Sequence, residues 1–376
     1  MDDQEWFDRL ETAADEPGEL FEHFETRSAR GLTFQVLPDA RHGLDRGTVL
    51  VEETGEVVPG YPSIPRILVL DPGVRSFFPD AERIAVEEKL NGFNVRVARV
   101  DGEALAFTRG GYVCPYTTAR ARDLLSPAAF FDDNPDLILC AELIGPETPY
   151  TSHDYPEIES DAIRVFDVRE RHSGDPLPVE RRLELCQEYG FEQPPFFGWH
   201  DPATAAAAVE DVLADLDADE REGIVMKAPG GARMVKYTTR AQHHKELAFA
   251  FSLPYEHGRD FLFSRLVREG FQAAELEDDP EKLRQRAREL GESILLPMVE
   301  TIDAIADGET VGEDHTVRGD PERIDALLDH LREFSLTLEI LEDRREDGER
   351  VLTFRKVSPS TVDRIDYYLD GGVVDE

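Results

Sequence analysis

Lysine is nearly absent from this chain: six of its 376 residues are lysine, and the other basic residues are arginine. Basic residues of both kinds number 41 against 80 aspartates and glutamates, which gives a formal net charge of −39. Taken alone, this charge excludes the broad basic face that usually binds nucleic acid. Near 1 M salt, however, the Debye length is only ~3 Å, so like charges repel each other only at short range. We therefore interpret the acidity as adaptation to a salt-rich, halophilic cell interior, where only local clusters of cations indicate the ligand.

Cysteines and long apolar segments are also scarce. The three cysteines, at positions 114, 140 and 186, have no metal-binding spacing, which favours buried thiols in a reducing cytosol. The first residues are acidic and lack the apolar core of a signal peptide. No segment approaches the ~18 apolar residues of a membrane-spanning helix. These absences predict a soluble, cytoplasmic protein that does not enter a membrane.

The chain is long enough for two or three domains, and a hydrophobic content of 40% argues against wholesale disorder. Its pattern is strand-rich in the middle and helical toward the end, which predicts an α+β fold. The pair Asp101–Gly102 separates two alternating apolar segments and predicts a β-hairpin. We predict an N-terminal domain over residues 1–60, a strand-rich domain over 61–245, a helical region over 246–316, and a helix–hairpin–helix region over 317–376.

Three of the six lysines, Lys89, Lys227 and Lys236, lie on or beside predicted strands. A lysine with a pKa of ~10.4 is neutral in only about one molecule in a few thousand at pH 7, so a nucleophilic lysine needs burial, nearby cations or a metal ion to lower its pKa. If the three lysines converge on one pocket, each lowers the pKa of the others, and together they can bind phosphate. Glu87 and Glu88 would oppose this, so we expect strand alternation to turn at least one of them outward.

The segment EEKLNGFN resembles the KxxG motif of the covalent nucleotidyltransferases, which include ATP-dependent ligases and mRNA-capping enzymes. In that superfamily the motif lysine attacks the α-phosphate of ATP and becomes lysyl-AMP. KxxG alone is a weak signal, but further elements follow here in the order of the superfamily. These elements are FTRGG with Arg109, AELIG with Glu142, RVFDV with Phe166, REGIVMK with Glu222 and Lys227, and RMVKY with Lys236. The resemblance implies an ATP-grasp-like ligase domain of antiparallel sheets with flanking helices.

The resemblance also implies roles for the charged residues. Lys89 would be the nucleophile, and Lys227 and Lys236 would contact the α-phosphate and stabilise the charge of the transition state. Glu222 would bind the catalytic Mg²⁺, because hard cations prefer carboxylate oxygens. The implied cofactors are therefore ATP and Mg²⁺.

A second group of residues would bind the nucleoside. Glu142 would accept hydrogen bonds from the ribose, and Arg109 would contact the nucleotide or an RNA 5′-phosphate. Phe166 would stack on adenine, although core packing is an alternative for a phenylalanine on an apolar strand. Asn94 and Arg96 lie on one face of a strand, opposite Val95 and its apolar neighbours, and both would face the nucleotide if the valines face the core.

The layout of the whole chain is similar to the archaeal ATP-dependent RNA ligase family. Asn94 stands where DNA ligases usually have arginine, and too few strands follow Lys236 to form the OB-fold domain of DNA ligases and capping enzymes. The resemblance implies an RNA substrate with 5′-phosphate and 3′-hydroxyl ends, and a homodimer held together by the C-terminal region. The alternatives are a DNA ligase, a GTP-using capping enzyme, or a catalytically idle RNA-binding protein. Lysines kept in a lysine-poor chain argue against the idle protein, because arginine would have served for charge alone.

The sequence departs from the superfamily pattern at two positions. Asn91 stands where many members have aspartate, which removes a charge that would raise the pKa of Lys89. Met234 stands where motif V often has a first lysine, which leaves Lys236 as the only lysine of that motif.

Overall fold

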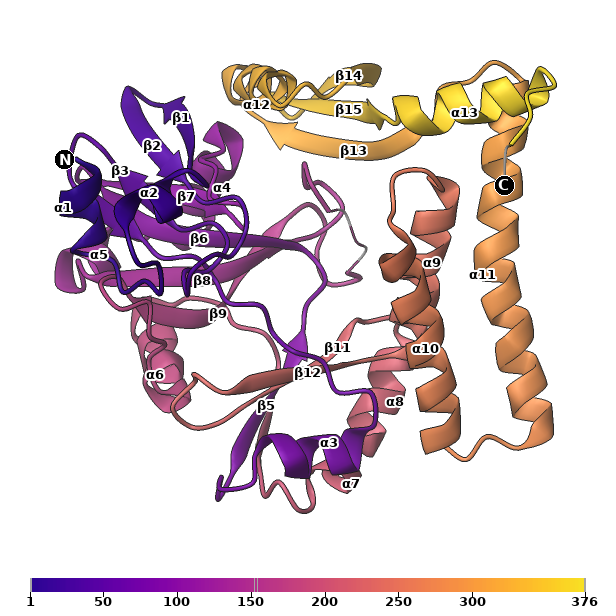
Figure 1. Cartoon of the computed structure of the whole chain (residues 1–376), viewed down its shortest axis with the longest axis horizontal. Coiled ribbons are helices and arrows are strands. Elements are labelled where there is room, and N and C mark those ends of the chain that lie inside the picture. The colour runs from indigo at the N-terminus through magenta and orange to yellow at the C-terminus, as the bar shows by residue number, and fades with distance from the viewer. Residues whose placement is uncertain (1, 152, 154, 375–376) are drawn as a thin grey trace.

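The computed structural model describes residues 2–151, 153 and 155–374, and it confirms the α+β prediction. Its four sheets are antiparallel, with helices packed against them (Figure 1). The first sheet, in the order β1-β2-β3-β4, follows two short helices. The elements of this N-terminal part are α1 (Asp3–Phe7), α2 (Pro17–Phe21), β1 (Glu25–Ala29), β2 (Leu32–Val36), β3 (Val49–Val51) and β4 (Glu56–Val58).

A second sheet forms the wall against which this N-terminal sheet packs. Its strands, in the order β7-β6-β8-β9, are β7 (Glu103–Thr108), β6 (Phe93–Val100), β8 (Leu137–Ile144) and β9 (Ala162–Glu170). Phe34 and Val36 of the N-terminal sheet share one buried cluster with Ala98 and Phe107. The core of the N-terminal part is therefore continuous with the core of the second sheet, across the predicted domain boundary at residue 60.

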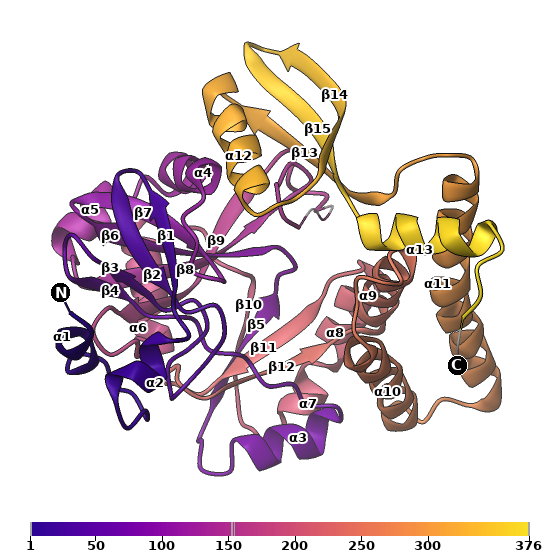
Figure 2. The same cartoon turned by 45° about the horizontal axis from the view of Figure 1, so that its top comes forward.

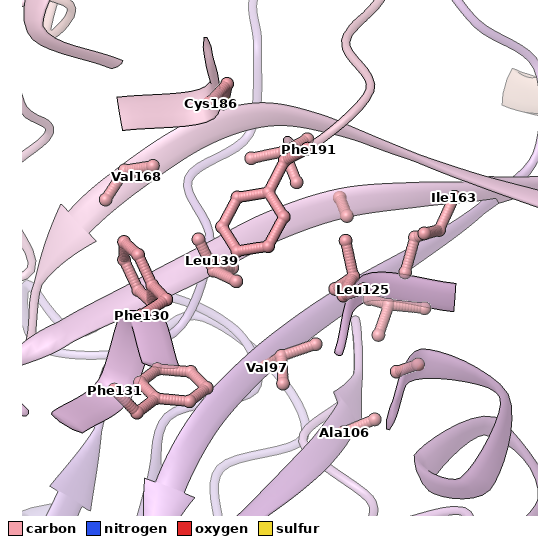
Figure 3. Packing of buried hydrophobic residues seen from close by; sticks show 14 of the residues in the cluster. Val97, Ala106, Leu125, Phe130, Phe131, Leu139, Ile163, Val168, Cys186 and Phe191 are labelled. Carbon is pink, nitrogen blue, oxygen red and sulfur yellow. The ribbon is translucent and has the colours of Figure 1, made fainter. Parts of the chain in front are cut away.

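The opposite face of the second sheet is covered by α4 (Pro115–Leu125), α5 (Ala128–Asp133) and α6 (Val179–Tyr189). Figure 3 shows Leu125 and Phe130 of these helices packed over Val97 and Leu139 of the strands. The predicted hairpin is confirmed: Asp101 and Gly102 have positive φ angles of 48° and 78° and join β6 to β7, as a two-residue turn of primed type requires.

The third sheet, in the order β10-β5-β11-β12, carries the three lysines discussed above. Its strands are β10 (Phe196–His200), β5 (Ile84–Lys89), β11 (Gly223–Lys227) and β12 (Met234–Thr238), and it packs on α3 (Leu70–Phe77), α7 (Ala205–Ala208) and α8 (Glu210–Ala218). The chain passes from β5 directly into β6 of the second sheet through residues 90–92. Lys89 therefore lies where the two sheets meet.

The C-terminal part begins with three long helices, α9 (Arg240–Ser252), α10 (Arg259–Glu275) and α11 (Pro280–Ala306), which stand beside the third sheet (Figures 1 and 2). The predicted helix–hairpin–helix is present as α12 (Pro321–Glu333), β14 (Leu338–Glu346), β15 (Glu349–Val357) and α13 (Pro359–Leu369). A further strand, β13 (Gly312–Gly319), was not predicted, and it pairs with β15 to complete a three-stranded sheet. Its polar sequence lacks the apolar alternation that marks most strands.

The three cysteines are free and buried, as predicted from their spacing. Among the described residues, no helix has the length and apolar character needed to cross a membrane.

Candidate functional site

A cavity of about 370 Å³ lies between the second and third sheets. Seven of the nine predicted site residues line it: Lys89, Asn94, Arg109, Glu142, Phe166, Lys227 and Lys236. The other two do not line it: Glu222 forms an ion pair with the lining residue Lys89, and Arg96 lies outside the cavity. Residues separated by up to 147 positions in the sequence are thus brought to one cavity, because β5 leads from one sheet into the other.

Gly92 makes the turn after Lys89 possible. A Cβ atom at this position would lie 2.5 Å from the carbonyl oxygen of Leu143 and 2.6 Å from Cγ2 of Ile144. Contacts this short are not tolerated, so only glycine lets the loop pass so close to β8. The motif glycine therefore brings Lys89 close to Glu142, which lies on the same strand as Leu143.

Lys89 is held between two carboxylates. Its Nζ lies 2.7 Å from Oε2 of Glu222 and donates more weakly to the carbonyl oxygen of Leu90 at 3.3 Å. Burial favours the neutral amine, but Glu222 and Glu142 together outweigh it and raise the pKa of Lys89. The prediction that neighbouring cations lower the pKa of Lys89 is wrong, because the charged side chains with the largest effect on it are the carboxylates of Glu222 and Glu142.

Lys236 does have a lowered pKa, and its ammonium has no hydrogen-bond or ion-pair partner among the described residues. Burial, followed by the charges of Lys89 and Arg66, lowers its pKa to about 8. Within the described part of the chain, Nζ of Lys236 makes no hydrogen bond or ion pair, in contrast to Lys89 and Lys227. Lys236 is therefore available to a phosphate group.

Lys227 is anchored by Glu87, a residue that the motifs did not single out. Its Nζ lies 2.8 Å from Oε2 of Glu87 and donates to the carbonyl oxygen of Phe166 at 2.7 Å. Arg182 of α6 also pairs with Glu87. Burial and the charge of Arg182 lower the pKa of Lys227, while the Glu87 carboxylate favours its charged form.

The expectation that Glu87 or Glu88 points outward is wrong. Their exposed fractions are 2% and 7%, because β5 is an interior strand covered on both faces. Burial raises the pKa of Glu88 to about 6, against the opposing effect of Arg221. Two neighbouring glutamates on an interior strand could have indicated that buried cationic partners exist. One such partner, Arg182, lies 93 residues after Lys89, so only the fold identifies it.

Glu142 and Asn94 face each other across β8 and β6. Burial raises the pKa of Glu142 to about 7, and the Lys89 charge acts against this increase. Oδ1 of Asn94 is buried and has no hydrogen-bond partner in the described part of the chain. A buried polar atom of this kind usually has a partner, so a ligand with a donor at this point of the cavity fits both side chains.

Phe166 forms part of an apolar wall of the cavity, together with Ile64, Pro194 and Val225. The ring of Tyr61 packs edge-on against it, with centroids 5.3 Å apart. A wall of this shape suits the flat face of a nucleobase.

Arg109 and Arg96 have different surroundings. Arg109 lines the cavity, and its only hydrogen bond among the described residues is a long contact of 3.4 Å to Ser63. Arg96, with 1% of its surface exposed, donates to the carbonyl oxygens of Gly47, Thr108 and Pro59. The prediction that Arg96 faces the nucleotide is therefore contradicted: it joins the N-terminal sheet to the loop that carries Arg109.

The two departures from the superfamily pattern are also accounted for. Met234 is buried and does not line the cavity, and its sulfur lies 3.5 Å from the hydroxyl of Tyr61, which does. The side chain of Asn91 donates to Gln242 of α9 at 3.0 Å.

Two family models match the chain. One, described as RNA ligase, covers residues 82–238, and the other, described as the ligase Pab1020 C-terminal region, covers residues 249–372. An uncharacterized protein of Methanocaldococcus jannaschii is 37% identical over 340 residues, which are 88% of this chain and 85% of that protein.

Solved structures are similar over nearly the whole chain. Two described as archaeal ATP-dependent RNA ligase, forms 1 and 2, are 41% and 39% identical, with TM-scores of 0.87 and 0.92. The first match covers 94% of both chains, and the second covers 100% of both. A putative ATP-dependent DNA ligase from Aquifex aeolicus is 25% identical with a TM-score of 0.86, over 94% of this chain and 97% of that one.

Proposed function

The chain belongs to the archaeal ATP-dependent RNA ligase family, and we propose that it joins an RNA 5′-phosphate to a 3′-hydroxyl through a covalent Lys89–AMP intermediate. In the first step the neutral amine of Lys89 attacks the α-phosphorus of ATP, and pyrophosphate leaves. In the second, an oxygen of the RNA 5′-phosphate attacks the same phosphorus, and the lysine leaves. In the third, the 3′-hydroxyl attacks the RNA 5′-phosphorus, and AMP leaves.

The observation that carries this proposal is the convergence of Lys89, Lys227 and Lys236 on one cavity. Half of the lysines of a lysine-poor chain gather there, and the cavity volume of about 370 Å³ falls within the ~300–1,000 Å³ of typical small-molecule sites. Arginine could supply charge but not a nucleophile. The three amines therefore favour covalent chemistry at phosphorus over passive RNA binding.

The other lining residues would hold the nucleotide. The adenine ring would lie against Phe166, and the ribose hydroxyls would donate to Glu142 and to Oδ1 of Asn94. Lys236 and Arg109, which have no carboxylate partner in the described residues, would contact the phosphates. Lys227, held by Glu87, would stabilise charge that develops on the α-phosphate.

Glu222 would bind the Mg²⁺ ion. In the described ranges, no three His, Cys, Asp or Glu side chains are grouped so that they could hold a metal by themselves. One carboxylate beside a phosphate site nevertheless fits Mg²⁺, which commonly takes one or two carboxylates and completes its shell with phosphate oxygens and water. When bound, the ion supplies positive charge that offsets the phosphates and the Glu222 carboxylate.

The substrate is tested by comparing end-joining on 5′-phosphorylated single-stranded RNA with sealing of nicked DNA, each with ATP or GTP. We expect joining of RNA with ATP and Mg²⁺, and none of RNA that carries a 5′-hydroxyl. Nick sealing without RNA joining would favour the DNA ligase, and labelling by GTP alone would favour the capping enzyme.

The lowered pKa of Lys236 predicts a fall in activity at alkaline pH. Lys236 is charged below pH 8 and loses its proton as the pH rises through about 8, so its attraction for the ATP phosphates is lost above that value. We expect kcat/KM for lysyl-AMP formation to fall by up to about tenfold per pH unit above 8, relative to Lys236→Arg, which stays charged. The ratio of the two profiles cancels the titration of Lys89. A ratio that is constant from pH 7 to 10 would show that the charge of Lys236 is not needed.

We also propose that the protein is a homodimer that works in the salt-rich cytoplasm. Apolar side chains with about half of their surface exposed lie along α11 and directly after α10. They are Leu276, Leu283, Leu295 and Leu296. Exposed apolar patches of this kind often mark protein–protein contacts. Light scattering in molar KCl measures the assembly, and a monomer there would contradict the proposal.

A further inference from the structure

Asn91 lies two residues after Lys89, in the loop between β5 and β6, and it is held at three points. Its backbone N–H donates to the hydroxyl of Tyr155 at 2.8 Å, and that hydroxyl donates to the carbonyl oxygen of Asn91 at 3.0 Å. Its side-chain amide donates to Oε1 of Gln242 at 3.0 Å. Gln242 is 5% exposed and belongs to the first turn of α9, outside every motif described above.

The first turn of α9 is tied to Arg221 and Glu222, the two residues that precede β11. Thr239, the N-cap of this helix, accepts from the backbone N–H of Gln242 at 3.3 Å and donates to the carbonyl oxygen of Arg221 at 2.6 Å. The backbone N–H of Thr239 donates to the carbonyl oxygen of Glu222 at 3.0 Å. One turn of helix therefore connects the carboxylate partner of Lys89 with the loop that follows Lys89.

The hydrogen bonds continue from Gln242 into α10. Its Nε2 donates to Oε1 of Glu246 at 3.4 Å, and Oε2 of Glu246 accepts from Arg265 at 2.6 Å and from Arg268 at 3.3 Å. Burial disfavours the Glu246 carboxylate, but the arginines outweigh it and lower its pKa. Glu246, the last acceptor in this series of hydrogen bonds, therefore stays ionised.

The donor-to-acceptor direction of this series of hydrogen bonds depends on the side-chain amide of residue 91. Asn91 donates, Gln242 accepts with its oxygen and donates with its nitrogen, and Glu246 accepts. An ionised aspartate at position 91 has no donor, so Gln242 would have to turn its nitrogen toward that residue and lose Glu246. The asparagine is thus matched to a helix that lies 151 residues further along the chain.

We propose that Gln242 and Glu246 are positioning residues that act through Asn91, so that the helices α9 and α10 set the orientation of Lys89 for its attack on ATP. The proposal rests on the nucleophilic role of Lys89. Attack requires the reacting atoms to lie within about 3–3.5 Å in line, and a displacement of about 1 Å can cost on the order of a hundredfold in rate. A loop that loses one of its three tethers is expected to lose part of that alignment.

The test measures the rate of enzyme–AMP formation from α-labelled ATP in full-length Gln242→Leu. We expect the maximum rate to fall by about tenfold or more while the half-saturating ATP concentration stays the same, because no residue that lines the cavity changes. Gln272→Leu is the matched control. Gln272 is a glutamine of similar burial on α10, bonded to the hydroxyl of Tyr237 and the carbonyl oxygen of Thr238, both at 3.4 Å. Gln272→Leu should lower the urea concentration at the midpoint of unfolding but leave the rate of enzyme–AMP formation unchanged.

A rescue separates positioning from loss of stability. Gln242→Glu keeps an acceptor for Asn91 but places a carboxylate against Glu246, so we expect slow labelling. Adding Glu246→Gln restores a donor toward position 242, and labelling should recover toward the wild-type rate. A wild-type rate in Gln242→Leu, or a double variant no faster than Gln242→Glu, would overturn the proposal. Absence of label on the wild-type protein would instead overturn the proposed role of Lys89.

Discussion

Lys89→Arg is expected to abolish covalent labelling of the protein by α-labelled ATP, with a loss of at least about a thousandfold. An arginine at this position can keep the ion pair with Glu222, which in the wild type joins Nζ and Oε2 at 2.7 Å, so the site should keep its shape. Its guanidinium stays protonated at any workable pH and cannot attack phosphorus. The variant therefore removes the nucleophile while it keeps the charge.

Two controls make this result specific. Lys245→Arg changes a lysine that also pairs with a glutamate, Glu220 at 2.8 Å, but is 42% exposed at the side chain and outside the cavity. It should label like the wild type. Lys89→Arg should still seal RNA that is supplied already adenylated, because the third step does not use the lysine. Label retained in Lys89→Arg would refute the covalent mechanism.

The second large effect is expected in stability. Glu87→Gln keeps the volume of the side chain but removes the carboxylate with which Arg182 and Lys227 form ion pairs, in a buried site where the exposed fractions of the two cationic side chains are 2% and 5%. Uncompensated buried charge of this kind costs about 3–5 kcal/mol. We expect the free energy of unfolding, measured with urea at fixed salt, to fall by this amount.

Glu184→Gln is the matched control for this prediction. Glu184 lies on α6 beside Arg182, pairs with Arg181 at 3.2 Å, and is 65% exposed at its side chain. Exposed pairs contribute about 0–1 kcal/mol, so the control should unfold almost like the wild type. Equal losses in the two variants would show that Glu87 does not hold a buried charge network.

Much of the fold was predictable because its signals are local. The two-residue turn at Asp101–Gly102 depends on the backbone freedom of those residues, and the period-two pattern of β6 places Val95 and Val97 together in one buried cluster. β13 was missed because its stability comes from pairing with β15, 30 or more residues further along the chain, and its own sequence is polar. Pairing of this kind has no local signal.

The candidate site shows the same division. Lys89, Glu142 and Lys236 could be named because the spacing of a motif reflects chemistry that few other residue types can perform. Strand alternation placed Asn94 at the cavity but failed for Arg96, two residues along on the same face, because the N-terminal part covers that position and supplies the carbonyl oxygens of Gly47 and Pro59 as acceptors. Alternation tells which face a residue is on, but it does not tell what covers that face.

From the sequence alone, the order of the motifs determined the family and its class of reaction and predicted the nucleophile, because a series of motifs in that order has few other uses. The tertiary structure alone decided which charges are near one another: that Lys89 faces two carboxylates, that Glu87 joins Lys227 to Arg182, and that Asn91 is bonded to Gln242. The pKa of a group depends on the charges and the water within a few ångströms, and these neighbours come from distant parts of the chain.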